Sequence, residues 1–192
     1  KYHEKLKNIT EGDITERCLA SWRRHPGEFS VINHGDSWVN NMMFCYDEKG
    51  KPRDCKYLDY QLCLYTSPAI DLHYFISTSL ADDVIQDMNH LLDFYYIRLL
   101  MTLNKLKCNL KQIPSLKEFK DDFRRRSFYG LGTIVTVSSL VKADSRSDAT
   151  FDEILSPNAP EKGFRYHCYN NNAFKNAVIR LLPIYEKLGV FC

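Results

Sequence analysis

Three polar side chains stand in an order that suits phosphate chemistry. Asp36 follows a short apolar run, Asn41 lies five residues further on, and Asp59 closes the next apolar run. Kinase-type phosphotransferases place a catalytic Asp, a metal-binding Asn and a metal-binding Asp in this order. Asp36 would orient the attacking hydroxyl and accept its proton, while Asn41 and Asp59 offer the oxygen ligands that Mg²⁺ takes. The pattern predicts phosphate transfer that uses ATP and Mg²⁺.

Each of these residues also has a simpler explanation. Asp and Asn commonly cap backbone groups in turns, and an Asp after a strand is a common cap. The Asp-x-x-x-x-Asn spacing alone is weak evidence, but His34 and Gly35 precede it, and the loop lies in a strand–turn–strand context. The combination favours a kinase-type site. A metal-dependent phosphoesterase built on His34, Asp36 and Asp59 would need more His and Asp motifs than the chain has.

The composition limits the class of protein. The chain has 192 residues, 44% hydrophobic and 26% charged, which is ordinary for one globular domain. Lys plus Arg is 26 and Asp plus Glu is 24, so a net charge of +2 gives no electrostatic reason to expect nucleic acid or a membrane surface as partner. The 7 cysteines form no C-x-x-C pair and indicate a reducing, cytoplasmic environment. No stretch is long and apolar enough to span a membrane.

Hydrophobic periodicity predicts an α+β chain that is mostly helical, with a small β-hairpin packed on a helical bundle. The hairpin brings Asp59 back beside Asn41, because its two strands have similar lengths. A Ser-Pro pair at 67–68 predicts a helix start, and Pro183 is expected to kink or restart the last helix. Strands are expected at 29–32, 42–46 and 55–58, and helices at 1–24, from 69, from 82, at 116–141 and after 172, with 142–163 irregular.

Longer motifs connect these residues to a known family. The segments HGDSWVNNMMF at 34–44, YLDYQ at 57–61 and SPAIDLHYF at 67–75 resemble the ecdysteroid kinase-like proteins of insects and other invertebrates. These proteins are related to choline kinases and aminoglycoside phosphotransferases. The resemblance is close over 29–80 and looser to the C-terminus, where RLLPIYEKLGV resembles the ending of the family.

The resemblance implies a protein-kinase-like fold, of which residues 1–192 would be the C-terminal catalytic lobe. The catalytic loop and metal-binding hairpin would occupy 29–61 and a helical subdomain 67–192, with the N-terminal nucleotide lobe absent. The chain alone is therefore expected to bind ATP weakly and to turn over negligibly. The roles implied are the base for Asp36, metal ligands for Asn41 and Asp59, and support of the loop for His34 and Asp71. A favourable charge at a helix N-terminus also explains Asp71.

Differences from protein kinases indicate the acceptor. Trp38 stands where a protein kinase has Lys, and only seven residues separate Asp59 from Ser67, too few for an activation loop. The sequence therefore favours the hydroxyl of a small molecule over a peptide, and the resemblance implies an ecdysteroid or a similar lipophilic alcohol as a candidate acceptor. A non-catalytic remnant that serves as a binding module is the alternative.

The sequence does not indicate the oligomeric state. The basic run 124–126 is expected to be a solvated helix face, and 94–96 to be core, with one ring available to line the acceptor pocket.

Overall fold

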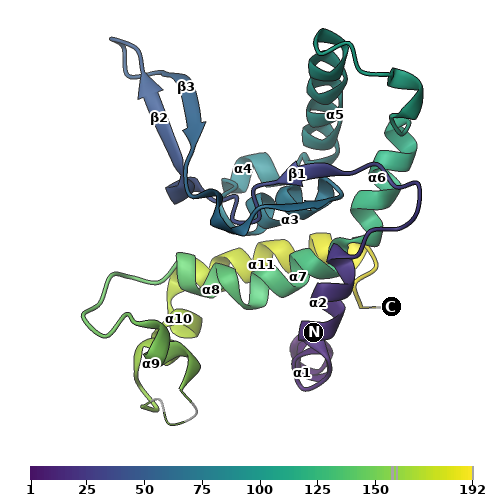
Figure 1. Cartoon of the computed structure of the whole chain (residues 1–192). Coiled ribbons are helices and arrows are strands. Elements are labelled where there is room, and N and C mark those ends of the chain that lie inside the picture. The colour runs from purple at the N-terminus through teal and green to yellow at the C-terminus, as the bar shows by residue number, and fades with distance from the viewer. Residues whose placement is uncertain (157, 159, 192) are drawn as a thin grey trace.

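A computed structural model describes residues 1–156, 158 and 160–191 (Figure 1). In this part of the chain, helices predominate and the strands form two small antiparallel sheets of two strands each. The predicted class, a mostly helical α+β chain with a small hairpin, is confirmed. The expected packing of this hairpin on the helical bundle is wrong, because residues 43–46 and 52–57 are all exposed and the hairpin projects away from the helices (Figure 1). None of the helices described is long and apolar enough to cross a membrane.

The strands build a hairpin and a short second sheet. The expected partner strand at 55–58 begins earlier, at Pro52, and a three-residue strand near residue 65 was not predicted because so short a segment shows no clear alternation. The elements are β1 (Val31–Asn33), which pairs with β4 (Leu64–Thr66), and β2 (Met42–Tyr46), which pairs with β3 (Pro52–Tyr57).

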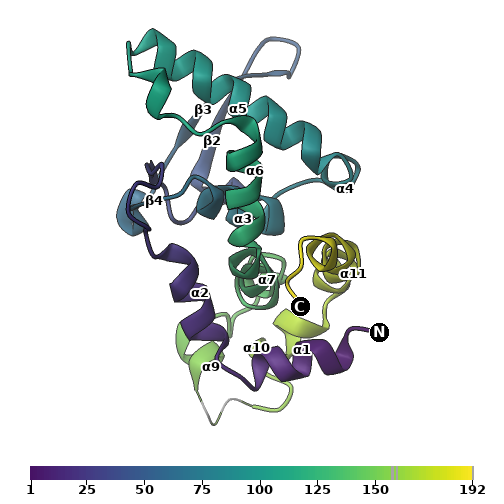
Figure 2. The same cartoon turned by 90° about the vertical axis from the view of Figure 1, so that its right-hand side faces the viewer.

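Helices α3, α7 and α11 form the centre of the molecule, and Figure 2 looks nearly along α7 and α11 with α3 above them. Leu131 and Ile134 of α7 and Tyr185 of α11 are completely buried there. The helices are α1 (His3–Thr10), α2 (Ile14–Trp22), α3 (Ala69–Thr78), α4 (Asp82–Ile85), α5 (Met88–Lys105), α6 (Leu116–Arg125), α7 (Ser127–Val135), α8 (Val137–Val141), α9 (Phe151–Leu155), α10 (Phe164–Asn170) and α11 (Asn172–Lys187).

Several helices are shorter than the periodicity predicted. The helix expected over 1–24 is divided into α1 and α2 around Gly12, a poor helix former. The helix expected over 116–141 is divided at Arg126 and at Thr136. The Thr136 hydroxyl donates to the carbonyl of Gly132 at 2.8 Å, a back-bond of the kind that bends helices. The stretch from residue 82 likewise separates into α4 and α5.

The C-terminal third also differs from expectation. The segment 142–163, expected to be irregular, contains the short helix α9, and α10 precedes the predicted last helix. That last helix, α11, continues across Pro183, so of the two expected outcomes, a kink or a restart, the restart is wrong. Asn171 caps α11, because its side chain accepts from the N–H of Phe174 at 2.8 Å.

Candidate active site

The loop of residues 34–41 joins β1 to β2. The first turn of α3 supports the N-terminal end of this loop. Asp71 accepts hydrogen bonds from the backbone N–H of His34 at 2.6 Å and of Gly35 at 2.9 Å. Burial raises the pKa of the Asp71 carboxyl, and these two N–H donors oppose that shift by favouring its charged form. The carboxylate therefore supports the start of the loop, in addition to its favourable place at a helix N-terminus.

Gly35 is required by the path of this loop. Its φ of +82° lies in the left-handed region, and a Cβ added there would lie 2.0 Å from the carbonyl oxygen of Leu62. A side chain would therefore clash with backbone, which cannot move aside as a flexible side chain could. The close approach fixes the 34–41 loop against the segment that follows Asp59.

Asn33, at the end of β1, connects three elements and was missed in the sequence. Its Nδ2 donates to the carbonyl of Thr66 on β4 at 3.1 Å, and its Oδ1 accepts from the N–H of Asp71 at 3.2 Å. Asn33 is almost completely buried. An amide at the end of an apolar strand could have been noticed, because a buried amide needs partners.

The Asp36 carboxylate is held from two sides. Asn41 Nδ2 donates to Asp36 Oδ2 at 2.8 Å and to the Asp36 carbonyl at 2.9 Å. The Tyr74 hydroxyl donates to Asp36 Oδ1. The structure therefore brings the expected base and the expected metal-binding amide into direct contact. The contact of Tyr74 was missed in the sequence, although Tyr74 lies three residues after Asp71 and hence near the same face of the helix.

His34 connects the loop to the strand that leads to Asp59. The N–H of Asp36 donates to His34 Nδ1 at 3.3 Å, so the proton of the neutral ring lies on Nε2, which donates to the carbonyl of Leu58 at 2.7 Å. The ring also lies 4.9 Å from that of Tyr60. These contacts give His34 the geometry of a support rather than that of a group facing substrate.

Asp59 lies next to this arrangement but is held much more loosely. The N–H of Leu58 donates to the carbonyl of Asn41 at 2.8 Å, so the hairpin returns the chain beside Asn41. Asp59 has a left-handed backbone with φ 64° and ψ 65°, uncommon outside glycine. Its carboxylate is exposed and accepts from Gln61 Nε2 at 3.3 Å.

The donor types of Asn41 and Asp59 fit Mg²⁺. Since Asn41 Nδ2 is engaged by Asp36, its Oδ1 is the atom available to a metal, and the Asp59 carboxylate is open to solvent. Groups of three or more His, Cys, Asp or Glu that could hold a metal are absent from the part of the chain described. Phosphate oxygens and water would therefore complete the coordination, as is usual for Mg²⁺.

An apolar cavity of about 480 Å³ lies between α3 and α5. His34 and Asp71 line one end of it, and Phe75 and Leu92 are among its apolar residues. Asp36 is not among the lining residues, because its carboxylate points to Tyr74 and Asn41. Phe94 and Tyr95 also line the cavity, and Phe94 is exposed, so the expectation that 94–96 is core is wrong at that residue.

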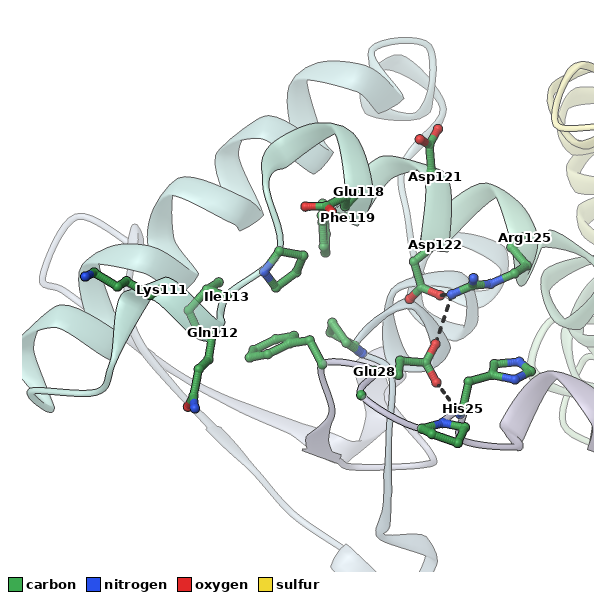
Figure 3. A pocket seen from close by; sticks show the side chains of 15 residues that line it. His25, Glu28, Lys111, Gln112, Ile113, Glu118, Phe119, Asp121, Asp122 and Arg125 are labelled. Carbon is green, nitrogen blue, oxygen red and sulfur yellow. Dashed lines mark hydrogen bonds and ion pairs between the residues drawn. The ribbon is translucent and has the colours of Figure 1, made fainter.

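A second cavity, of about 570 Å³, is polar and lies beside α6 (Figure 3). Glu28 and Asp122 line it and form ion pairs with Arg125. The adjacent Arg126 is only 3% exposed and pairs with both acids, so the expectation that 124–126 is a solvated face is wrong for this residue. The buried ion pairs connect the 25–29 loop to the end of α6. Asp36 does not line this cavity, so the cavity is separate from the candidate active site.

Comparison with known proteins identifies the family of the chain. The model of the ecdysteroid kinase-like family matches residues 1–108, which is more than half of the chain and includes Asp36, Asn41 and Asp59. Searches of curated proteins and of solved structures found no match. The chain belongs to the ecdysteroid kinase-like family.

Proposed function

We propose that this protein transfers the γ-phosphate of ATP to a hydroxyl group of a small molecule, and that residues 1–192 form the C-terminal lobe of a protein-kinase-like fold. The observation that carries the proposal is the contact of Asp36 with Asn41 in a loop fixed by Asp71. Phosphoryl transfer asks the protein mainly to position groups and to stabilise charge, and a rigid loop with a carboxylate at its turn suits the first task.

In this proposal Asp36 orients the acceptor hydroxyl and accepts its proton as the new bond to phosphorus forms. Asn41 and Asp59 would hold Mg²⁺ beside the nucleotide phosphates. The bound ion would neutralise the negative charge of these phosphates. His34 and Asp71 keep the loop in place and touch neither substrate nor nucleotide.

The acceptor is proposed to be a lipophilic alcohol such as an ecdysteroid. Family membership supports this class. The apolar cavity between α3 and α5 is not proposed as the acceptor site, since Asp36 does not line it.

The test is transfer of label from γ-labelled ATP to a panel of hydroxylated lipids by the full-length protein. Asp36→Asn keeps the size of the side chain but removes the base, and kcat should fall by about a hundredfold or more. Asp144→Asn makes the same chemical change at an exposed position and should leave kcat as it is. Near-normal turnover in Asp36→Asn would refute the assignment, and absence of transfer by the wild-type protein would favour the binding module.

A further inference from the structure

We propose that Tyr74 is a positioning residue, which fixes the Asp36 carboxylate in the orientation that receives the proton of the acceptor. This inference deepens the proposed function and rests on it. Tyr74 lies on α3, one turn beyond Asp71, so a single helix would support both the backbone of the loop and the carboxylate of the base.

The phenol of Tyr74 is fixed by its surroundings. Tyr74 is only 8% exposed and lies in a cluster with Ile70 and Tyr129, against which Trp38 packs. Burial, together with the hydrogen bond to Asp36, raises the pKa of the Tyr74 hydroxyl well above its usual value. The phenol therefore stays protonated at physiological pH and remains a hydrogen-bond donor.

The two donors to Asp36 come from different elements and reach different oxygens. Tyr74 on α3 donates to Oδ1, and Asn41 in the loop donates to Oδ2. Together they prevent rotation of the carboxylate, and each oxygen keeps a lone pair for a further donor. Since Asn41 is also the proposed metal ligand, Tyr74 is the partner whose loss would affect Asp36 alone.

The phosphate-transfer step depends on this orientation. The acceptor oxygen forms a bond to the γ-phosphorus, its proton passes to an Asp36 oxygen, and the bond from the γ-phosphorus to the bridging oxygen breaks, with the electron pair leaving on ADP. A carboxylate that turned away would lose the hydrogen bond to the acceptor, and misplacement of about 1 Å costs about a hundredfold in rate.

A competing explanation is that the Tyr74 hydroxyl occupies the place of the acceptor hydroxyl and blocks the base. The burial of the ring argues against it, because a blocking group must move away when substrate enters. The two explanations predict opposite results when the hydroxyl is removed, so kinetics can separate them.

The experiment is Tyr74→Phe in the full-length protein, assayed with γ-labelled ATP and ecdysone as the acceptor probe. The kcat should fall about tenfold to a hundredfold, the usual cost of losing a partner that orients a functional group, with both KM values within about twofold. Tyr129→Phe removes a hydroxyl from the same cluster without a contact to Asp36 and should leave kcat nearly unchanged. An unchanged kcat in Tyr74→Phe, or an equal fall in Tyr129→Phe, would overturn the proposal, and a rise in kcat/KM would establish the blocking role.

A double variant shows whether Tyr74 acts through Asp36. If it does, Asp36→Asn with Tyr74→Phe should be no slower than Asp36→Asn alone, because residues that act as a unit are not additive. The Tyr74 hydroxyl proton should also give a downfield NMR signal that Tyr74→Phe removes and Asp36→Asn moves. If the wild-type protein transfers phosphate to no lipid of the panel, the proposed function fails. The NMR signal still tests whether Tyr74 donates to Asp36, and absence of the signal overturns the inference.

Discussion

The two halves of the candidate site are built very differently. Asp36 lies in a loop fixed by Asp71 and close to Leu62, and its carboxylate has donors on both oxygens. Asp59 is exposed, and its carboxylate accepts a long hydrogen bond from Gln61. In the proposed mechanism the base must be oriented before the substrate arrives, whereas a metal ligand can be ordered by the ion it binds. The fold itself therefore orders the half that is proposed to transfer the proton.

Changes to the backbone of the fixed half should therefore lower the free energy of unfolding the most. Gly35→Ala introduces a Cβ at 2.0 Å from the Leu62 carbonyl oxygen and left-handed strain at φ +82°. The free energy of unfolding should fall by at least about 3 kcal/mol, through strain and overpacking together. Urea denaturation followed by circular dichroism measures this change.

The matched control for Gly35→Ala is Gly50→Ala in the hairpin turn. Gly50 has a similar φ, +74°, but an added Cβ meets nothing within 4 Å. Gly50→Ala should therefore cost only the left-handed strain, about 1 kcal/mol. Equal losses in the two variants would show that the contact of Gly35 with Leu62 does not hold the loop.

The folded state should also lose stability in acid, because α3, which supports the fixed half, carries a buried neutral imidazole. His73 Nε2 donates to the carbonyl of Phe123 at 2.8 Å, and Nδ1 accepts from the Tyr185 hydroxyl at 3.0 Å. Burial lowers the pKa of His73 from 6.5 to about 4. Between these values the unfolded chain binds a proton that the folded chain does not, so stability is complete above pH 6.5 and is lost as pH falls towards 4.

The expected loss from His73 is about 3 kcal/mol, since one pKa unit corresponds to about 1.4 kcal/mol. Denaturation at a series of pH values measures it, and His73→Gln should remove this part of the slope even if the variant is less stable throughout. His90→Gln, at an exposed position on α5, should leave the slope in place. A slope that survives in His73→Gln would assign the acid sensitivity to other groups.

The sequence predicted the site residues and turns that are marked by residue type and spacing. It did not predict the residues whose role depends on tertiary contacts. The Asp36, Asn41 and Asp59 pattern and the hairpin that carries it were readable from residue types and spacing. Tyr74 was not, because a tyrosine on a helix face looks the same whether it packs or donates to a carboxylate. The burial of Arg126 was also hidden, since its partner Glu28 lies far away in sequence.

The loosely held half predicts the smallest effect on folding. Asp59→Asn removes the charge and keeps a residue that tolerates the left-handed backbone, so the free energy of unfolding should change by less than about 0.5 kcal/mol. Affinity for ATP in the presence of Mg²⁺, measured by calorimetry on the full-length protein, should nevertheless fall about tenfold or more, because a carboxylate is the stronger ligand for Mg²⁺. Asp54→Asn, an equivalent exposed change on β3, should alter neither quantity. Unchanged affinity in Asp59→Asn would remove Asp59 from the metal site, and a large loss of stability would mean that the two halves are equally fixed.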